Sequence, residues 1–210
     1  MKLFLVLFLV FFVACTQQVV QPVVQSPVDN ATGVVSVNPF LVEVLAMASV
    51  SPNLQYRFSV LPRLNSEMVW LVGDRAKIEP VAGIVVPEYS FVYIDFGRKE
   101  ALGKCVARSR IPCKEPGKQV VLPFDNFTHP TPYDWVKKVP VSAQVIGTEA
   151  FDRQEHTVVV FTDGAQQLKF WIHDFYKLPS KVEVLENEQI TTYLYGFVSA
   201  GNIKVQDVVP

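Results

Sequence analysis

The sequence predicts a mainly β protein of the α+β class, organised around an antiparallel sheet, and three features support this prediction. Within Val145–Tyr195, two apolar runs flank Asp163-Gly164, and an Asp-Gly step between β-rich segments is a strong hairpin signal. Pro179 and the polar step Glu186-Asn187-Glu188 separate further short apolar runs, as turns do between strands. From Leu54 to Val60, apolar and polar residues alternate with period two, which indicates a strand with one buried face.

Residues 1–14 predict a signal peptide. After Lys2, an unbroken run of 12 apolar residues extends from Leu3 to Ala14, which is shorter than the roughly 20 residues that span a bilayer. Val13-Ala14-Cys15 is similar to the end of a lipoprotein signal, where cleavage leaves the cysteine first and its sulfur carries a lipid. Because a two-chain lipid anchors stably, we expect an exported protein tethered through Cys15 to the outer face of the cell membrane. A short uncleaved anchor is the alternative.

Residues 15–38 predict a lipidated cysteine followed by a flexible tether, which leaves 39–210 as the folded domain. The segment after Cys15 is rich in Gln, Pro, Ser and Val, and its first charge is Asp29. Such a composition cannot bury enough apolar surface to offset the entropy of ordering. Its Val pairs leave a loose edge strand as the alternative. Asn30 and Asn126 begin N-glycosylation sequons, which matter only in a host that glycosylates.

Two helices are expected. Asn38 and Pro39 supply a cap and a first position for a helix over Pro39–Val50, which is apolar nearly all round and is expected to pack on the sheet. Thr131 and Pro132 begin a second helix that extends to Lys138. Its Trp135 is expected to anchor the core, with a ligand platform as the alternative.

The remaining strands fall on both sides of the second helix. Several of them are apolar on both faces, for example Val69–Val72 and Leu168–Ile172. The second face is therefore buried by helices, closed over itself, or available to an apolar ligand. The expected strands, besides Leu54–Val60, are Glu67–Val72, Arg75–Glu79, Tyr89–Phe96, Thr157–Thr162, Leu168–Ile172, Lys181–Val184 and Thr191–Phe197.

Cys105 and Cys113 predict a disulfide, because they form an even pair in an exported protein once Cys15 is assigned to lipid. A metal site is the rival hypothesis. Zinc needs four ligands, and the three histidines, His129, His156 and His173, show no metal-binding spacing. We therefore expect neither metal nor cofactor.

Charge and motifs exclude two broad functions. The formal net charge is −1, and no basic run is interleaved with aromatic residues as a phosphate backbone would require, so we expect no nucleic-acid binding. No serine lies in a G-x-S-x-G or S-x-x-K setting, and no acid pair lies in a catalytic motif. We therefore expect the protein not to be an enzyme.

Three segments carry a resemblance to a known family: Ile146-Gly147-Thr148-Glu149, Lys169-Phe170-Trp171-Ile172-His173 and Leu178-Pro179-Ser180-Lys181-Val182-Glu183. Weaker matches are Tyr93-Ile94-Asp95, Ala101-Leu102-Gly103-Lys104-Cys105 and Pro132-Tyr133-Asp134-Trp135. Through these segments the chain resembles the lipoprotein-carrier (LolA-like) superfamily, especially its membrane-tethered prokaryotic lipoproteins. The resemblance covers about two-thirds of the chain and departs from the family at His173, where an Asp is usual, and at Lys177, where a Gly often precedes Leu-Pro. Soluble carriers of the superfamily also lack a lipid-bearing cysteine, so a fixed receptor or holder is the nearer analogue.

This resemblance implies a curved antiparallel sheet that forms an unclosed half-barrel, with a few short helices on its concave face. It also implies a set of aromatic side chains as candidates for lining a hydrophobic ligand cavity, and plain core packing is the alternative for each. The candidates are Tyr56, Phe58, Trp70, Tyr93, Phe170, Trp171 and Tyr195.

Two functional hypotheses follow. The first is a membrane-anchored lipoprotein that binds a lipid, an acyl chain or another hydrophobic ligand in the half-barrel, in lipid or lipoprotein trafficking. The second is a non-catalytic structural or protein-interaction module of the cell envelope, in which the core is filled and the rim or edge strands make the contacts.

Overall fold

The computed structural model describes residues 38–210 except 63–65, 81–87, 108 and 111–112. Ser36–Pro210 forms one compact unit. The predicted signal peptide (1–14), the lipid on Cys15, nearly all of the tether and Asn30 lie outside the described residues.

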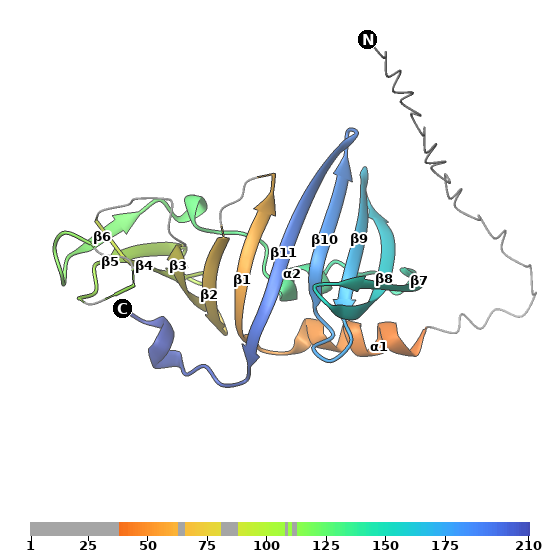
Figure 1. Ribbon diagram of the computed structural model, residues 1–210, viewed down its shortest axis with the longest axis horizontal. Coiled ribbons are helices and arrows are strands. Elements are labelled where there is room, and N and C mark those ends of the chain that lie inside the picture. The colour runs from red at the N-terminus through yellow and green to blue at the C-terminus, as the bar shows by residue number, and fades with distance from the viewer. Residues whose placement is uncertain (1–37, 63–65, 81–87, 108, 111–112) are drawn as a thin grey trace, which may run out of the picture. The chain divides into compact units, whose positions relative to one another are not determined.

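The described residues form one antiparallel sheet of 11 strands, in the order β6-β5-β4-β3-β2-β1-β11-β10-β9-β8-β7. The edges, β6 and β7, are not paired with each other, so the sheet does not close into a barrel (Figure 1). This confirms the predicted fold class, an unclosed antiparallel sheet with few short helices. The strands are β1 (Asn53–Leu61), β2 (Ser66–Val72), β3 (Arg75–Pro80), β4 (Phe91–Asp95), β5 (Glu100–Lys104), β6 (Gln119–Leu122), β7 (Gln144–Phe151), β8 (Gln154–Asp163), β9 (Gln166–His173), β10 (Pro179–Glu186) and β11 (Gln189–Ala200).

The predicted meander is strands β8 to β11, each paired antiparallel with the next. Gly164 supplies the left-handed backbone, with φ of 61°, at the turn between β8 and β9. The sequence patterns did not predict β5, β6 or β7. Strand β7 has little alternation to detect, because six of its eight residues are exposed.

The helices begin where the caps predicted them and are shorter than expected. The backbone N–H of Phe40 donates to the Asn38 side chain at 2.9 Å, and α1 (Pro39–Ala46) continues into a 3₁₀ turn, η1 (Met47–Ser49). Thr131 and Asp134 form a reciprocal capping box at the start of α2 (Pro132–Val136). Further 3₁₀ turns are η2 (Phe124–Asn126) and η3 (Val205–Val208). Among the described residues, no helix has the length and apolar character needed to cross a membrane.

The side of the sheet that the helices cover, here called the helix face, carries the main core. Leu41 and Val44 of α1 and Trp135 and Val136 of α2 pack in one buried cluster with alternate residues of strands β1–β5 and β8–β11. This cluster buries one of the two apolar faces that the sequence shows for several strands. Its sheet residues include Leu54, Tyr56, Phe58, Val69, Ile78, Val92, Val159, Phe170, Val182 and Tyr195.

The opposite side, here called the outer face, is covered in the first half by the C-terminal segment. η3 contacts β2 and β3, and its Val208 is buried. Asn53 fixes the start of this segment, since its side chain donates to Ile203 O at 3.0 Å and accepts from Ile203 N at 3.1 Å. The outer face of β2 and β3 is therefore closed by the chain itself.

The predicted disulfide joins Cys105 and Cys113, with their Cα atoms 5.7 Å apart. Cys105 directly follows β5, and its backbone N–H donates to Lys118 O at 2.9 Å. The bridge thus braces the connection between β5 and β6, and a small loop of this kind contributes mainly local stability.

A buried hydrogen-bond chain fastens α2 to the centre of the sheet. Trp135 Nε1 donates to the Tyr195 hydroxyl at 2.6 Å, and that hydroxyl donates to Pro130 O at 2.6 Å. Trp135 and Tyr195 are both nearly inaccessible to solvent. Removing the hydroxyl would leave a buried N–H and a carbonyl without partners, which costs more than the loss of one exposed hydrogen bond.

We therefore expect Tyr195→Phe to lower the free energy of unfolding by roughly 1–3 kcal/mol in urea denaturation. Tyr193→Phe is the matched control, because Tyr193 lies on the same strand and contacts the Trp135 ring, with centroids 5.0 Å apart. No hydrogen bond of the Tyr193 hydroxyl is found within the described part of the chain. Equal small losses for both variants would contradict a structural role for this chain of hydrogen bonds.

Candidate functional site

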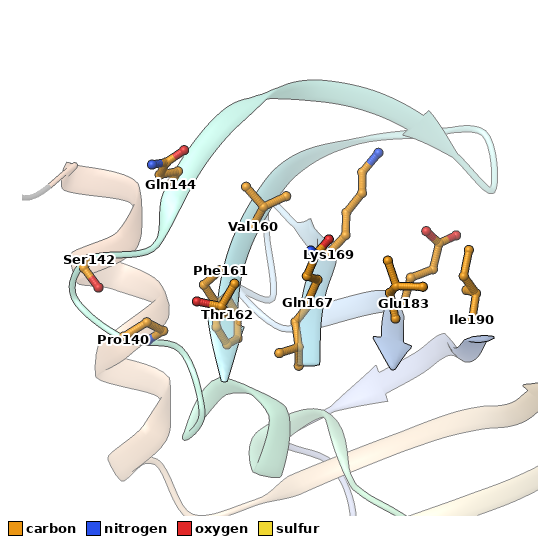
Figure 2. A pocket seen from close by; sticks show the side chains of 12 residues that line it. Pro140, Ser142, Gln144, Val160, Phe161, Thr162, Gln167, Lys169, Glu183 and Ile190 are labelled. Carbon is orange, nitrogen blue, oxygen red and sulfur yellow. The ribbon is translucent and has the colours of Figure 1, made fainter. Parts of the chain in front are cut away.

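A groove of about 550 Å³ lies on the outer face at the end of strands β8 to β11 (Figure 2). Cross-strand register explains its floor: Val160 pairs with Lys169, and Lys169 pairs with Glu183, so side chains from three strands form one row. The segment Pro140–Gln144, which leads from α2 into β7, forms one wall. Its volume lies in the range of small-molecule sites. The lining residues are Pro140, Ser142, Gln144, Val160, Phe161, Thr162, Gln167, Leu168, Lys169, Glu183, Leu185 and Ile190.

The lining is amphipathic. Val160, Leu185 and Ile190 offer apolar side chains, and Ile190 is 60% exposed. Ser142, Gln144, Thr162 and Gln167 offer hydroxyls and amides around them. Lys169 and Glu183 lie on the floor between these apolar side chains, so the groove can contact an apolar chain at Val160, Leu185 and Ile190 and bind a polar group on the floor or at the rim.

Glu149 joins β7 to β9 across the intervening strand. Its carboxylate accepts from Lys169 Nζ at 2.8 Å and from Trp171 Nε1 at 2.7 Å. The hydrogen bond from Lys169 is the largest cause that lowers the pKa of Glu149, followed among the lowering causes by the bond from Trp171. Figure 2 shows the β7–β8 hairpin arching over the groove with Lys169 pointing toward it. We call this contact the Glu149 latch.

The indole of Trp171 lies between two ammonium groups. Lys169 Nζ and Lys181 Nζ are 4.4 and 3.8 Å from its ring centroid, and Lys181 also pairs with Glu183 at 2.6 Å. Cation–π contacts of this kind strengthen when water is excluded, and Trp171 is only 4% exposed. These charges alternate in sign, so the outer face beside the groove has no net charge of one sign.

Four of the predicted ligand-contacting residues lie in the packed core of the helix face. Tyr56, Phe58, Phe170 and Tyr195 are all buried, and they contact one another or α2 through edge-to-face and tilted rings. None of these four lines the groove. Their role toward a ligand stays a prediction, and their present contacts are those of core residues.

The other three predicted residues point to the outer face. Trp70 lies under Lys77, whose Nζ is 4.3 Å from its ring centroid, and Tyr93 borders a pocket of about 210 Å³ closed by Val208–Pro210. Trp171 adjoins the groove through Lys169, which lines it. The structure thus divides the seven candidates between two faces of the sheet.

A half-buried histidine, His129, links Tyr56 and Phe58 to the segment before α2. The His129 ring stacks on Phe58 with centroids 3.7 Å apart, and its Nε2 lies 3.2 Å from the Tyr56 hydroxyl. Burial lowers the pKa of His129 to about 4, and the nearby charge of Asp134 opposes this shift only partly. The ring is therefore neutral at pH 7.

Sequence reasoning missed the polar pair His156 and Ser180. His156 Nε2 lies 2.9 Å from Ser180 Oγ, and its Nδ1 lies 3.1 Å from Gln154 O. Both side chains are buried, at 1% and 4% exposure, and the pair links β8 to β10. Neither residue lines the groove. No motif spacing could have found it, because the contact depends on strand register. Within the described ranges, no group of three or more His, Cys, Asp or Glu residues could hold a metal ion.

No protein-family model and no curated protein matches this chain. An uncharacterized conserved protein from Thermus thermophilus aligns at 10% identity and a TM-score of 0.45, over 80% of this chain and 90% of that one. MucB in complex with MucA(peri) aligns at 12% identity and a TM-score of 0.43, over 81% of this chain and 58% of the matched chain. The MucA/MucB complex of Pseudomonas aeruginosa aligns at 11% identity and a TM-score of 0.44, over 80% and 58%. TM-scores below 0.5 at such identities do not establish a common family, so the LolA-like resemblance stays a prediction.

The Glu149 latch predicts a graded response to substitution. Glu149→Gln keeps an acceptor for Trp171 and loses the ion pair, whereas Glu149→Ala loses both. We expect amide hydrogen exchange across residues 145–151 to quicken in both variants, and more in the alanine variant, with a global loss of roughly 1 kcal/mol or less because the pair is partly exposed. Glu100→Ala, at an exposed position of β5, is the control. Unchanged exchange in β7 would rule out the latch.

The pKa of His129 predicts a loss of stability in acid. The unfolded chain takes up a proton near pH 6.5 and the folded chain only near pH 4, so stability falls as pH drops through this window. We expect roughly 3 kcal/mol to be lost by pH 4. His129→Phe keeps a ring on Phe58 and does not titrate, so its loss between pH 7 and pH 4 should be smaller by that amount in chemical denaturation. Identical pH profiles would contradict the assignment.

Proposed function

We propose that this protein is a non-enzymatic binding protein that holds an amphipathic ligand with an acyl chain in the groove of β8–β11. The observation that supports this best is the amphipathic groove of about 550 Å³ on the outer face. A smaller pocket of about 410 Å³ lies on the helix face beside Trp135, Val184 and Tyr193, and polar side chains such as Lys138, Gln166 and Glu186 make up much of its lining. The ligand site is therefore proposed in the groove of the outer face, which is the larger of the two and offers more apolar side chains.

The groove suits non-covalent binding driven by apolar burial. An acyl chain laid along Val160, Leu185 and Ile190 would remove apolar surface from water on both partners, at roughly 25 cal/mol per Å². The polar head would lie among Ser142, Gln144 and Lys169, which offer hydroxyl, amide and ammonium groups. The openness of the groove to solvent favours a ligand that is only partly buried.

We further propose that the protein is exported and anchored by a lipid on Cys15, with residues 15–38 as its tether. The apolar run Leu3–Ala14 and the Val13-Ala14-Cys15 step support this. Membership of the LolA-like superfamily is proposed on the motif resemblance together with the unclosed antiparallel sheet. A role in lipid or lipoprotein trafficking follows from that membership.

A protein-interaction module is the second candidate, and edge strand β7 favours it. Six of its residues are exposed, and an unpaired edge can accept an extended segment of a partner. The β-bulge between Val145 and Gly147 interrupts this edge, and bulges discourage strand addition. Ligand binding in the groove is therefore the first proposal.

Native mass spectrometry tests the proposal directly. We expect residues 36–210, purified from a membrane-containing host, to carry a co-purifying lipid at fixed stoichiometry. Leu185→Asp and Ile190→Asp should each reduce the lipid-bound fraction at least tenfold, because a carboxylate on the groove floor would have to be desolvated.

Val121→Asp is the matched control, because Val121 is 83% exposed on β6, the opposite edge of the sheet. It should leave the lipid-bound fraction unchanged. A ligand-free mass in every variant, with no uptake of added phospholipids, would reject the proposal in favour of the interaction module.

A further inference from the structure

The turn between β9 and β10 presents one aromatic ring to solvent. Phe175 is 81% exposed, whereas its neighbour Tyr176 packs against the Phe197 ring with centroids 5.0 Å apart. A single exposed aromatic residue is common on protein surfaces and needs no function. Two other features bear on the role of Phe175: the hydrogen bonds of its turn and the position of the turn beside α1.

The first feature is that the turn is rigidly built. The backbone N–H of Phe175 donates to His173 Nδ1 at 3.1 Å, and the N–H of Lys177 donates to His173 O at 2.8 Å. None of these bonds involves the Phe175 ring. The ring contacts the neighbouring Tyr176 ring edge to face, with centroids 5.1 Å apart, and most of it stays exposed.

The second feature is the position of the turn beside α1. Lys177 Nζ pairs with Glu43 of α1 at 2.8 Å and lies 4.3 Å from the centroid of the Phe40 ring. Figure 1 shows α1 and the β9–β10 turn at the same end of the sheet. The segment outside the described residues leads into this helix, because Asn38 caps α1.

The proposed tether ends at α1, the helix that lies beside this turn. Only 22 residues separate Cys15 from Asn38, and they span at most about 80 Å in any conformation. A domain held through α1 carries the β9–β10 turn next to its point of attachment. The edge strand β6 lies at the other end of the strand order.

We infer that Phe175 is a membrane-contact residue that inserts into the interfacial region of the lipid surface to which the chain is tethered. An aromatic ring gains from partition into the headgroup boundary of a bilayer. The inference rests on the proposed tether and not on ligand binding in the groove.

The charges around the turn favour a neutral lipid surface. Asp174 accepts from the Thr157 hydroxyl at 2.8 Å, Lys177 pairs with Glu43, and Asp152 borders the same pocket as Phe175. No excess of positive charge surrounds the ring among the described residues, so the contact is expected to be insensitive to anionic lipid and to salt.

Fluorescence quenching by brominated lipids tests this inference on the full chain. The full chain is reconstituted into phosphatidylcholine vesicles, with and without one-fifth phosphatidylglycerol, and recovered by flotation. Phe175→Trp adds a reporter at the turn, and Val121→Trp adds one at the similarly exposed site on β6. The signal of the parent protein, with its three native tryptophans, is subtracted.

We expect bromines placed high in the acyl chains to quench the reporter at position 175 several-fold more than the reporter at position 121, equally in both kinds of vesicle. Equal weak quenching at the two positions in floated protein would overturn the membrane contact and leave the tether intact. Such a result would point to a protein partner for Phe175. A chain that does not float with vesicles would overturn the tether and this inference together, without bearing on the lipid-bound fraction measured for the groove.

Discussion

The contact between Glu149, Lys169 and Trp171 is the constraint on which the outer face depends. It joins the edge strand β7 to β9 across β8, through bonds of 2.8 and 2.7 Å to one carboxylate. Because β7 has no second partner among the described strands, this contact and the β7–β8 ladder hold the hairpin in its arch over the groove. The same Lys169 lines the groove, so the residue that fastens the edge strand also faces the proposed ligand.

The two faces of the sheet differ in what covers them. On the helix face, side chains of α1 and α2 pack against the sheet, and the hydrogen-bond chain Trp135–Tyr195–Pro130 fastens α2. A pocket of about 410 Å³ remains there beside Trp135, Val184 and Tyr193. The outer face is covered in one half by the C-terminal segment and in the other, within the described part of the chain, by the β7–β8 hairpin and the segment Pro140–Gln144. A half-barrel that stores a ligand beneath its helices and one that holds a ligand outside them can share a strand pattern, and side-chain packing distinguishes them.

The sequence predicted the features that depend on a few neighbouring residues, namely turns, helix caps and the cysteine pair. Asp163-Gly164 placed the hairpin, Asn38 and Thr131 placed the helix starts, and the even cysteine pair placed the disulfide. Strand β7 was not predicted, because an exposed edge strand does not need to alternate apolar and polar residues. The groove was not predicted either, because Val160, Lys169 and Glu183 become neighbours only through the cross-strand register of β8, β9 and β10. In Phe170-Trp171-Ile172, consecutive apolar residues give no periodicity from which to assign a face, so Trp171 could not be separated from the core residues on either side.

The central claim is that the ligand lies on the outer face of β8–β11. Photo-crosslinking with a phospholipid that carries a diazirine in its acyl chain, followed by peptide mapping of the labelled residues, tests this claim most directly. The account predicts labels within 160–169 and 183–190, with none on Tyr56, Phe58 or Phe170. Labels concentrated on those three core residues would contradict it and would place the ligand beneath the helices.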